Sequence, residues 1–261
     1  MSRFEQGITS LDLKLFEKIN SQSTEHDKQS FLAIQLAVRN LRPAYNYLEI
    51  GSYLGGSIQP HLLDERCARI YSLDKRPLAQ PDARGFDYRY LNNSTERMLE
   101  QLRDVAPDSM DKITTIDGDS RSIDVAQVKD KIDLCFIDGE HTDEAVLADF
   151  KFCLEALQPN GCIAFHDAQI TYNGLANCID LLKSSGVSFY AYALPSIVFV
   201  VEIGDFPVHN EPVIMERLLN NHESYLYSLQ DNDHYRRFAN KYPFRTVRNF
   251  VSRVLGGNVS Q

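Results

Sequence analysis

The chain has 261 residues, of which 43% are apolar, and a formal net charge of −9. This composition supports a sizeable core and excludes a disordered or fibrous protein. No apolar run approaches the roughly 18–20 residues that span a bilayer, and the first twenty residues mix charged with apolar side chains, unlike a signal peptide. We therefore expect a folded, cytoplasmic protein.

Residues 1–43 are predicted to be helical. Apolar side chains recur at helical spacing at Phe31, Ile34, Val38 and Leu41, and Pro43 follows as a stop signal. We interpret this segment as a helical cap that packs against a central domain, predicted at residues 44–203, or forms a lid over it.

A glycine turn follows the first predicted strand, residues 46–50. Gly51 ends the strand, and Gly55, Gly56 and Ser57 lead into a helix expected at residues 58–68. A strand that ends in such a turn before a helix is typical of a ligand-binding site.

Acidic residues follow the next three predicted strands. Ligands of open α/β sheets bind beyond the carboxyl ends of the strands, so these acids are candidates for ligand contacts. The third of the strands is a nearly continuous apolar run, as expected for a strand covered on both faces. The strands and the residues that end or follow them are 70–73 with Asp74, 113–116 with Asp119 and Ser120, and 132–137 with Asp138.

The next predicted helix begins after Thr142, a good N-cap. Its apolar face predicts that Asp143 and Asp149 are surface residues. Pro159-Asn160-Gly161 closes this helix before a strand at residues 162–165, which leads to His166 and Asp167.

Two final strands are predicted at residues 188–193 and 197–202. Only three residues separate them, too few for a parallel crossover, so they form an antiparallel hairpin. The predicted fold is therefore α/β: a Rossmann-like, seven-stranded, mostly parallel sheet with an antiparallel last strand and helical N- and C-terminal extensions.

The five cysteines form no C-x-x-C pair and fall mostly in apolar periodic segments. A thiol in such a segment behaves as a small hydrophobic side chain. We expect free, buried cysteines.

The glycine turn discriminates between classes of nucleotide ligand. The dinucleotide pattern G-x-G-x-x-G needs a small middle glycine so that the backbone can approach a pyrophosphate, and here Tyr53 takes that position between Gly51 and Gly56. No Gly-Lys-Ser/Thr follows, which excludes a phosphate-binding P-loop. A nucleoside without phosphates stays compatible, and Asp74, 23 residues past Gly51, can accept hydrogen bonds from ribose hydroxyls.

Over roughly residues 45–203 the chain resembles the class I S-adenosylmethionine-dependent methyltransferases. The matching motifs are E-I-G-S-Y-L-G-G-S, S-L-D, I-D-G-D-S and I-D-G-E-H. More narrowly, D-G-E-H-T-D-E-A-V-L-A-D-F and L-Q-P-N-G-C-I-A-F-H-D are similar to a subfamily of sugar and antibiotic O-methyltransferases that includes proteins named cephalosporin hydroxylases. The resemblance implies methyl transfer from S-adenosylmethionine to a hydroxyl of a sugar, glycan or small natural product. N-methylation, or cofactor binding without this reaction, is the alternative.

The resemblance also implies roles for single residues. Glu49 would hold the amino group of the cofactor, Asp74 the ribose, and Asp119 with Ser120 the adenine. The implied cofactor-binding residues are Glu49, Gly51, Ser52, Tyr53, Gly55, Ser57, Asp74, Asp119, Ser120 and Asp138.

Two chemistries are open for the histidines and acids. Some relatives bind Mg²⁺ after the fourth and fifth strands, and Asp138, His166 and Asp167 would be the metal ligands here; imidazole suits softer metals better than Mg²⁺. The other interpretation makes His141 a general base that takes the hydroxyl proton. We prefer His141 as the catalytic base, with Asp138 and Asp167 binding a metal or orienting the acceptor.

The carboxyl end is basic. From His234 onward the chain has six basic residues and no acidic one. Apolar residues from Val247 to Leu255 share a helical face, which predicts a basic amphipathic helix in the extension 204–261. It would dock on the acidic domain or on a second subunit of a homodimer; peripheral contact with a membrane is the alternative. The overall negative charge argues against a nucleic-acid partner.

Overall fold

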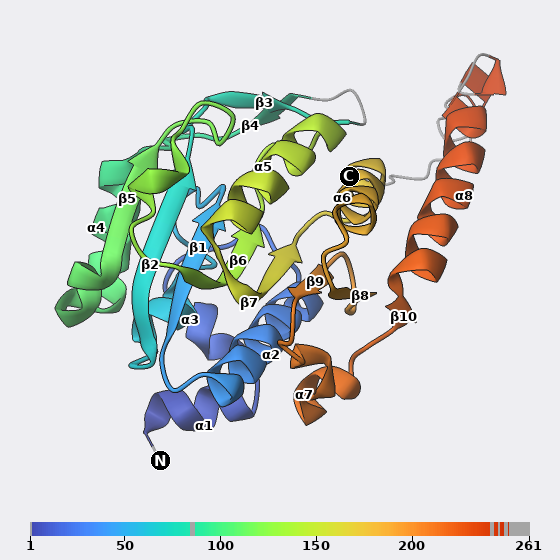
Figure 1. Ribbon diagram of the computed structural model, residues 1–261. Coiled ribbons are helices and arrows are strands. Elements are labelled where there is room, and N and C mark those ends of the chain that lie inside the picture. Colours follow the sequence, from blue (N-terminus) through green and yellow to red (C-terminus); the bar gives the residue numbers. More distant parts are fainter. Residues whose placement is uncertain (1, 84–86, 241–242, 245, 248–249, 251–261) are drawn as a thin grey trace.

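A mixed eight-stranded sheet runs through the centre of the computed structural model, which describes residues 2–83, 87–240, 243–244, 246–247 and 250 (Figure 1). The strand order is β10-β8-β9-β7-β6-β1-β2-β5. The strands are β1 Tyr45–Ile50, β2 Cys67–Asp74, β5 Ile113–Asp117, β6 Ile132–Ile137, β7 Leu157–Phe165, β8 Phe189–Ala193, β9 Phe199–Ile203 and the two-residue β10 Asn220–Asn221.

The strand directions confirm the predicted fold. β5, β2, β1, β6 and β7 pair in parallel, and β9 runs antiparallel between β7 and β8. β10 extends the sheet beyond β8 by a short antiparallel pair. The carboxyl ends of the five parallel strands therefore meet at one edge of the sheet, where ligands of such folds bind.

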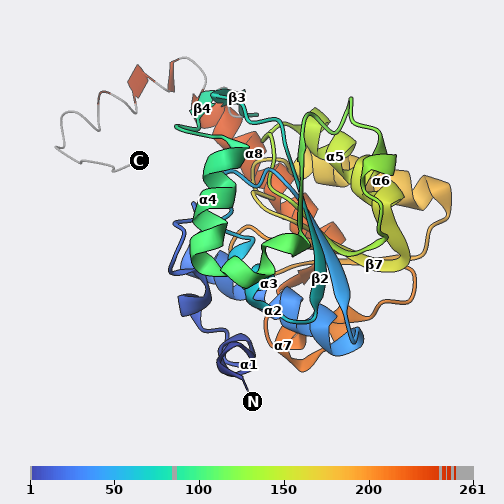
Figure 2. The same ribbon diagram turned by 90° about the vertical axis from the view of Figure 1, so that its left-hand side faces the viewer.

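Helices cover both faces of the sheet, which Figure 2 shows edge-on between α2, α3 and α4 on one side and α5 and α6 on the other. Alternate strand residues enter two separate cores: Leu48 and Ile50 pack with α5, α6 and α8, whereas Tyr47 packs with α2, α3 and α4. The helices are α1 Arg3–Thr9, α2 Glu25–Leu41, α3 Gln59–Leu63, α4 Thr95–Val105, α5 Asp143–Ala156, α6 Tyr172–Ser185, α7 Pro212–Met215 and α8 His222–Asn240.

Two local predictions were wrong, and one element was not predicted. The helix expected at residues 58–68 ends at Leu63, because the Asp64 carboxylate pairs with Arg39 and accepts the backbone N–H of Arg66, which turns the chain into β2. β7 begins at Leu157, so Pro159-Asn160-Gly161 belongs to the strand. The segment around residue 80 contains an unpredicted hairpin of β3 Ala79–Pro81 and β4 Asp87–Arg89.

The cysteine prediction is confirmed, because all five thiols are buried and free. No helix among the described residues is long and apolar enough to cross a bilayer.

The N-terminal segment is tied to the sheet by the buried side chain of Gln59. Its oxygen accepts the backbone N–H of Ile19 at 2.9 Å, and its amide donates to the carbonyls of Ile19 and Gly56, both at 2.8 Å. These bonds hold the segment before α2 against the glycine turn. The domain boundaries at residues 43 and 203 stay a prediction.

At the carboxyl end, α8 packs on α6 and β8. The predicted basic amphipathic helix lies largely outside the described residues, so its contact with a domain, a second subunit or a membrane stays a prediction.

Candidate functional site

The glycine turn after β1 is built for close backbone approach. Gly51 has φ +92°, and a Cβ atom there would lie 2.1 Å from the carbonyl oxygen of Asp138. Gly55 has φ +84°, and Tyr53 adopts φ +45°, which is uncommon for a residue with a side chain. Gly51 therefore lets the turn lie directly against the chain that leaves β6.

Asp74 holds this turn from the end of β2. Its carboxylate accepts the backbone N–H of Tyr53 at 2.8 Å and that of Arg76 at 2.7 Å. Ser72 on the same strand donates to Ser52 at 2.8 Å. The predicted cofactor residues Gly51, Ser52, Tyr53 and Asp74 are thus brought together at one edge of the sheet.

Glu49 is fully buried behind the turn. It accepts hydrogen bonds from the hydroxyls of Tyr47 and Ser57, both at 2.6 Å. Burial raises the pKa of Glu49 to about 7, against the lowering effect of these two bonds. Glu49 thereby fixes Ser57 before α3; its predicted contact with the cofactor's amino group stays a prediction.

A cavity of about 200 Å³, here called the His141 cavity, opens beside the turn. It is bounded by the loop that precedes α2, the β3–β4 hairpin, the turn after β1 and the loops after β6 and β7. Its lining residues are Asn20, Ser21, Gln22, Ser23, Thr24, Asp27, Gly51, Ser52, Tyr53, Gly56, Ser57, Tyr88, Tyr90, Asp138, His141, His166, Asp167, Gln169, Ile170 and Ile197.

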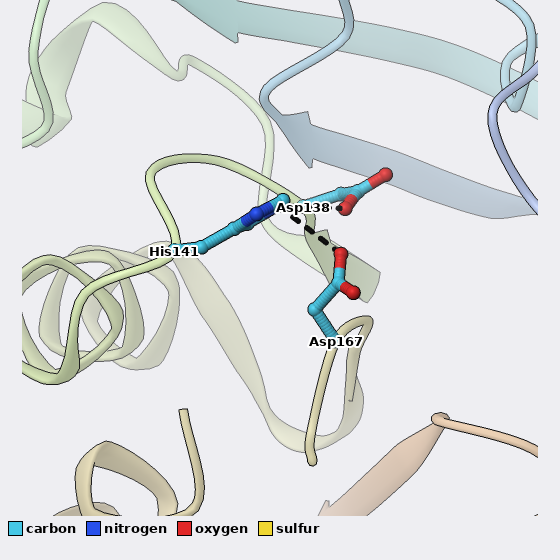
Figure 3. A group of neighbouring side chains, drawn as sticks. All are labelled: Asp138, His141 and Asp167. Atoms are coloured by element: carbon cyan, nitrogen blue, oxygen red, sulfur yellow. Dashed lines mark ion pairs between the residues drawn. The ribbon is translucent and has the colours of Figure 1, made fainter. Parts of the chain in front are cut away.

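Asp138, His141 and Asp167 all line this cavity, and Figure 3 shows that their side chains lie close together. His141 Nε2 lies 3.1 Å from Asp167 Oδ2 and 4.0 Å from Asp138 Oδ1, and its Nδ1 lies 3.7 Å from Asp82. Asp167 adopts φ +53°, an unusual conformation for an aspartate that follows a strand. The sequence predicted these three catalytic candidates, and the structure brings them together.

His166 lies behind the pair of acids and is buried. Its Nδ1 is 3.0 Å from both Asp138 Oδ1 and Asp167 Oδ2, and its Nε2 is 3.5 Å from Asp27 on α2. Burial alone would lower the pKa of His166, but the three carboxylates outweigh it and raise that pKa well above its usual value. In turn, the hydrogen bonds from His166 and Thr24 lower the pKa of Asp27 in spite of its burial. The surrounding acids therefore favour the protonated form of His166.

The metal candidates are arranged differently from the predicted set. Among the described residues, Asp138, His141 and Asp167 can each turn one ligand atom toward a common point, with those atoms within 4.8 Å of one another. His166 contacts the same acids from the other side. The residues thus offer a mixed imidazole and carboxylate donor set, which suits transition ions better than Mg²⁺.

A second depression, here called the Asp149 pocket, lies beyond Gly51 and is lined by Asp74, Asp119, Ser120 and Asp149 among others. Asp119 binds Arg121, whose Nε donates at 2.8 Å, and the side-chain bond to Arg121 lowers the pKa of Asp119. Ser120 donates instead to Asp149, with 2.5 Å between the two oxygens.

Asp149 is the residue that sequence reasoning missed. It was predicted on the surface of α5, yet it is only 6% exposed, and burial raises its pKa to about 7. A signal was present, because Asp149 shares the helical face of Val146 and Cys153, which are both buried.

Comparisons with known proteins agree with this geometry. Residues 48–168 match the model of a family described as a methyltransferase domain. Similar solved structures include a calicheamicin methyltransferase, 15% identical, with a TM-score of 0.51 over 78% of this chain and 95% of that chain. An O-methyltransferase from Streptomyces achromogenes involved in tomaymycin synthesis is 15% identical, with a TM-score of 0.49 over 78% and 90% of the two chains. A search of curated proteins found no match.

The family match covers residues 48–168, less than half of the chain, and the sheet order and the calicheamicin methyltransferase structure show a methyltransferase-like fold around the glycine turn. Over these residues the chain is similar to the family described as a methyltransferase domain.

Proposed function

We propose that the chain transfers the methyl group of S-adenosylmethionine to a hydroxyl of a sugar, a glycan or a small natural product. The observation that carries this proposal is His141, held 3.1 Å from Asp167 in the wall of a cavity that adjoins the glycine turn. A histidine ordered by a carboxylate is the group that removes a hydroxyl proton near neutral pH.

The residues of the site divide the reaction between alignment and proton removal. Methyl transfer is a displacement at a carbon that the sulfonium already activates, so the enzyme mainly positions the acceptor oxygen in line. We assign the Nε2 proton of His141 to the bond with Asp167, which leaves Nδ1 to accept the acceptor's proton. Asp138 and Asp167 hold the ring in this orientation.

The site also fits a sulfonium nucleoside. Only glycine fits at position 51, because a Cβ atom there would collide with the Asp138 carbonyl, and this places the turn directly beside Asp138. Carboxylates stand near it, and the lining of the His141 cavity, as far as the structure describes it, contains no lysine or arginine that would bind a phosphate. A cationic, phosphate-free cofactor matches this charge.

The cavity wall supports a neutral, hydroxylated acceptor. Amide and hydroxyl side chains from residues 20–24 face it together with Gln169, and these groups both donate and accept hydrogen bonds. Tyr88 and Tyr90 add aromatic faces, with the Tyr90 ring centroid 5.3 Å from that of Tyr53. The calicheamicin methyltransferase of the same fold is named for a natural product, which supports this class of acceptor.

A metal-assisted reaction is the second candidate, because Asp138, His141 and Asp167 form a plausible ligand group. A divalent ion held there would polarise the acceptor hydroxyl. His141 serves either as ligand or as base, so the two candidates exclude each other at this residue. Metal analysis of purified wild-type and His141→Ala protein, with activity measured in chelator, separates them: full activity in chelator removes the metal.

Calorimetry with S-adenosylhomocysteine tests the cofactor, and a screen of hydroxylated acceptors with a labelled methyl donor tests the reaction. We expect S-adenosylhomocysteine to bind and NAD not to bind; the reverse would overturn the proposal. Asp138→Ala should abolish methyl transfer. Labelling of amine acceptors alone would replace O-methylation by N-methylation.

A further inference from the structure

The two ring nitrogens of His166 face carboxylates on opposite sides of the ring. Nδ1 lies 3.0 Å from both Asp138 Oδ1 and Asp167 Oδ2. Nε2 is buried, and its one partner among the described residues is the carboxylate of Asp27, whose Oδ2 lies 3.5 Å away. His166 therefore connects the first turn of α2 to the two acids that line the His141 cavity.

The other neighbours of the His166 ring are apolar. Phe31 packs edge-on against it, with 5.6 Å between the ring centroids, and the centroid of Phe136 lies at 6.4 Å. A buried polar atom without a partner is costly, so the observed orientation of the ring depends on the carboxylate opposite Nε2. Removal of that carboxylate would allow the ring to rotate away from Asp138 and Asp167.

Asp27 is itself fixed from two sides. Its Oδ2 accepts the backbone N–H of Thr24 at 2.9 Å and the Thr24 hydroxyl at 2.7 Å, and its Oδ1 accepts the backbone N–H of Ile197 at 3.4 Å. The Asp27 side chain is fully buried. The loop before α2 and the connection between β8 and β9 thus hold this carboxylate in place, so it can support the His166 ring.

The acids that His166 contacts are the ones that orient the proposed base. Asp167 Oδ2 lies 3.0 Å from His166 Nδ1 and 3.1 Å from His141 Nε2, so one carboxylate oxygen is shared by the two imidazole rings. A rotation of His166 would remove one of the contacts that fix this oxygen. A small misplacement of a reacting group lowers the rate of a transfer that depends on alignment.

We propose that Asp27 is a positioning residue for methyl transfer: it fixes the His166 ring, which holds Asp138 and Asp167 and thereby the ring of His141. This inference rests on the proposed function, because it assumes that His141 removes the proton of the acceptor. Asp27 acts through other side chains and does not contact the reacting atoms. The predicted helical cap would then supply part of the support for the base.

A double-mutant cycle on the full chain tests this role, with the acceptor found by screening. Asp27→Ala should lower kcat about tenfold. The KM of the acceptor and the Kd of S-adenosylhomocysteine should change by less than about twofold, because the contact serves the transfer step. In a His141→Ala background the same substitution should lower kcat by less than about twofold, since residues that act as a unit have non-additive effects.

Glu5 provides a matched control for the loss of a helix cap. It has the same place in the capping box of α1 that Asp27 has in the capping box of α2, and it lies outside the lining of the His141 cavity. Glu5→Ala should keep kcat within about twofold of wild type. If Asp27→Ala does not fold, Asp27→Asn replaces it in the cycle; the amide keeps an oxygen for Nε2, so the expected loss is about threefold.

A crystal structure of the Asp27 variant gives a measurement that does not depend on activity. The His166 ring should be rotated, and Asp167 Oδ2 should lie further than 3.1 Å from His141 Nε2. An unchanged kcat, an equal loss in the wild-type and His141→Ala backgrounds, or an unmoved His166 ring would overturn the inference and leave the proposed function intact. If His141→Ala itself lost less than about threefold in kcat, the proposed function would fall, and this inference with it.

Discussion

Asp27 in the His141 cavity and Asp149 in the Asp149 pocket are the same residue type, yet their pKa values are shifted in opposite directions. In the cavity, Asp27 contacts His166, and hydrogen bonds outweigh burial to lower its pKa. In the pocket, Asp149 has only a serine hydroxyl at hydrogen-bonding distance, and burial raises its pKa to about 7. The contrast teaches that partners, more than burial, decide whether an aspartate here is a fixed charge or a titrating group.

Replacing the proposed base, His141, should slow methyl transfer without weakening the binding of S-adenosylhomocysteine. His141→Ala is expected to lower kcat about 10²- to 10⁴-fold, because proton removal by a positioned base contributes on that scale. Initial rates with the acceptor found by screening measure kcat, and calorimetry measures the affinity for S-adenosylhomocysteine. His26→Ala, on an exposed part of α2, is the control. A loss of less than threefold would contradict the role of His141.

The glycine turn that joins the two cavities should be the next most sensitive point. Gly51→Ala combines a clash with the Asp138 carbonyl and a left-handed backbone, so we expect about 3 kcal/mol of lost stability and weaker binding of S-adenosylhomocysteine. Gly186→Ala is a matched control: its φ is +67°, with nothing within 4 Å of the added methyl group. It should cost only about 1 kcal/mol in thermal unfolding. Equal losses would show that the close approach at Gly51 is not needed.

The pH dependence of the free energy of unfolding should have opposite signs for Asp149 and Asp27. The pKa of Asp149 is about 7 in the folded state and about 3.9 in the unfolded chain. Its contribution to the free energy of unfolding therefore falls as pH rises from 4 through 7. Asp149→Asn should therefore gain stability relative to wild type over this window, by roughly 1–3 kcal/mol. Denaturant unfolding at pH 5 and pH 7.5 measures the change; a constant difference between the proteins would contradict it.

For Asp27, the contribution to stability should change with pH in the opposite direction, which Asp27→Asn tests. The folded-state pKa of Asp27 is depressed, so its stabilising effect is present above pH 4 and is lost as pH falls further. The variant should be less stable than wild type at pH 6, and the difference should shrink in acid. Unfolding curves between pH 3 and pH 6 check this. If the stability difference between variant and wild type grew as pH fell, the pKa of Asp27 would not be lowered in the folded state.

The smallest expected effect concerns access to the pocket. Glu140→Gln removes the ion pair with Lys75 in the lining of the Asp149 pocket, and partly exposed pairs contribute up to about 1 kcal/mol. We expect S-adenosylhomocysteine to bind up to about fivefold more tightly, by calorimetry. Weaker binding would mean that Glu140 itself contacts the ligand.

Features that depend on local pattern were predictable from the sequence. The uninterrupted apolar run of β6 marked a central strand, and the short spacing between β8 and β9 required a hairpin. Gly51 marked the turn, and the acids after each parallel strand reached a common edge because strand order and direction place them there.

Features that depend on tertiary partners were not predictable. Asp149 was assigned to the surface because hydropathy treats an acid as exposed, whereas its position depends on Ser120, 29 residues away. The contact between Asp27 and His166 joins α2 to the loop after β7, and no local pattern encodes it. The strands β3 and β4 have three residues each, too few to show alternation.

The Gln59 side chain has a consequence for how new specificities could arise. It anchors residues 16–19 to the glycine turn, and Ser21 packs on Gly56, where a methyl group would lie 2.7 Å from its Cβ. Gln22 and Ser23, just beyond this anchor, form cavity wall and contact none of the residues proposed to remove the proton. Substitutions at these two positions can therefore redesign the acceptor range in a directed-evolution library while the groups that remove the proton stay unchanged.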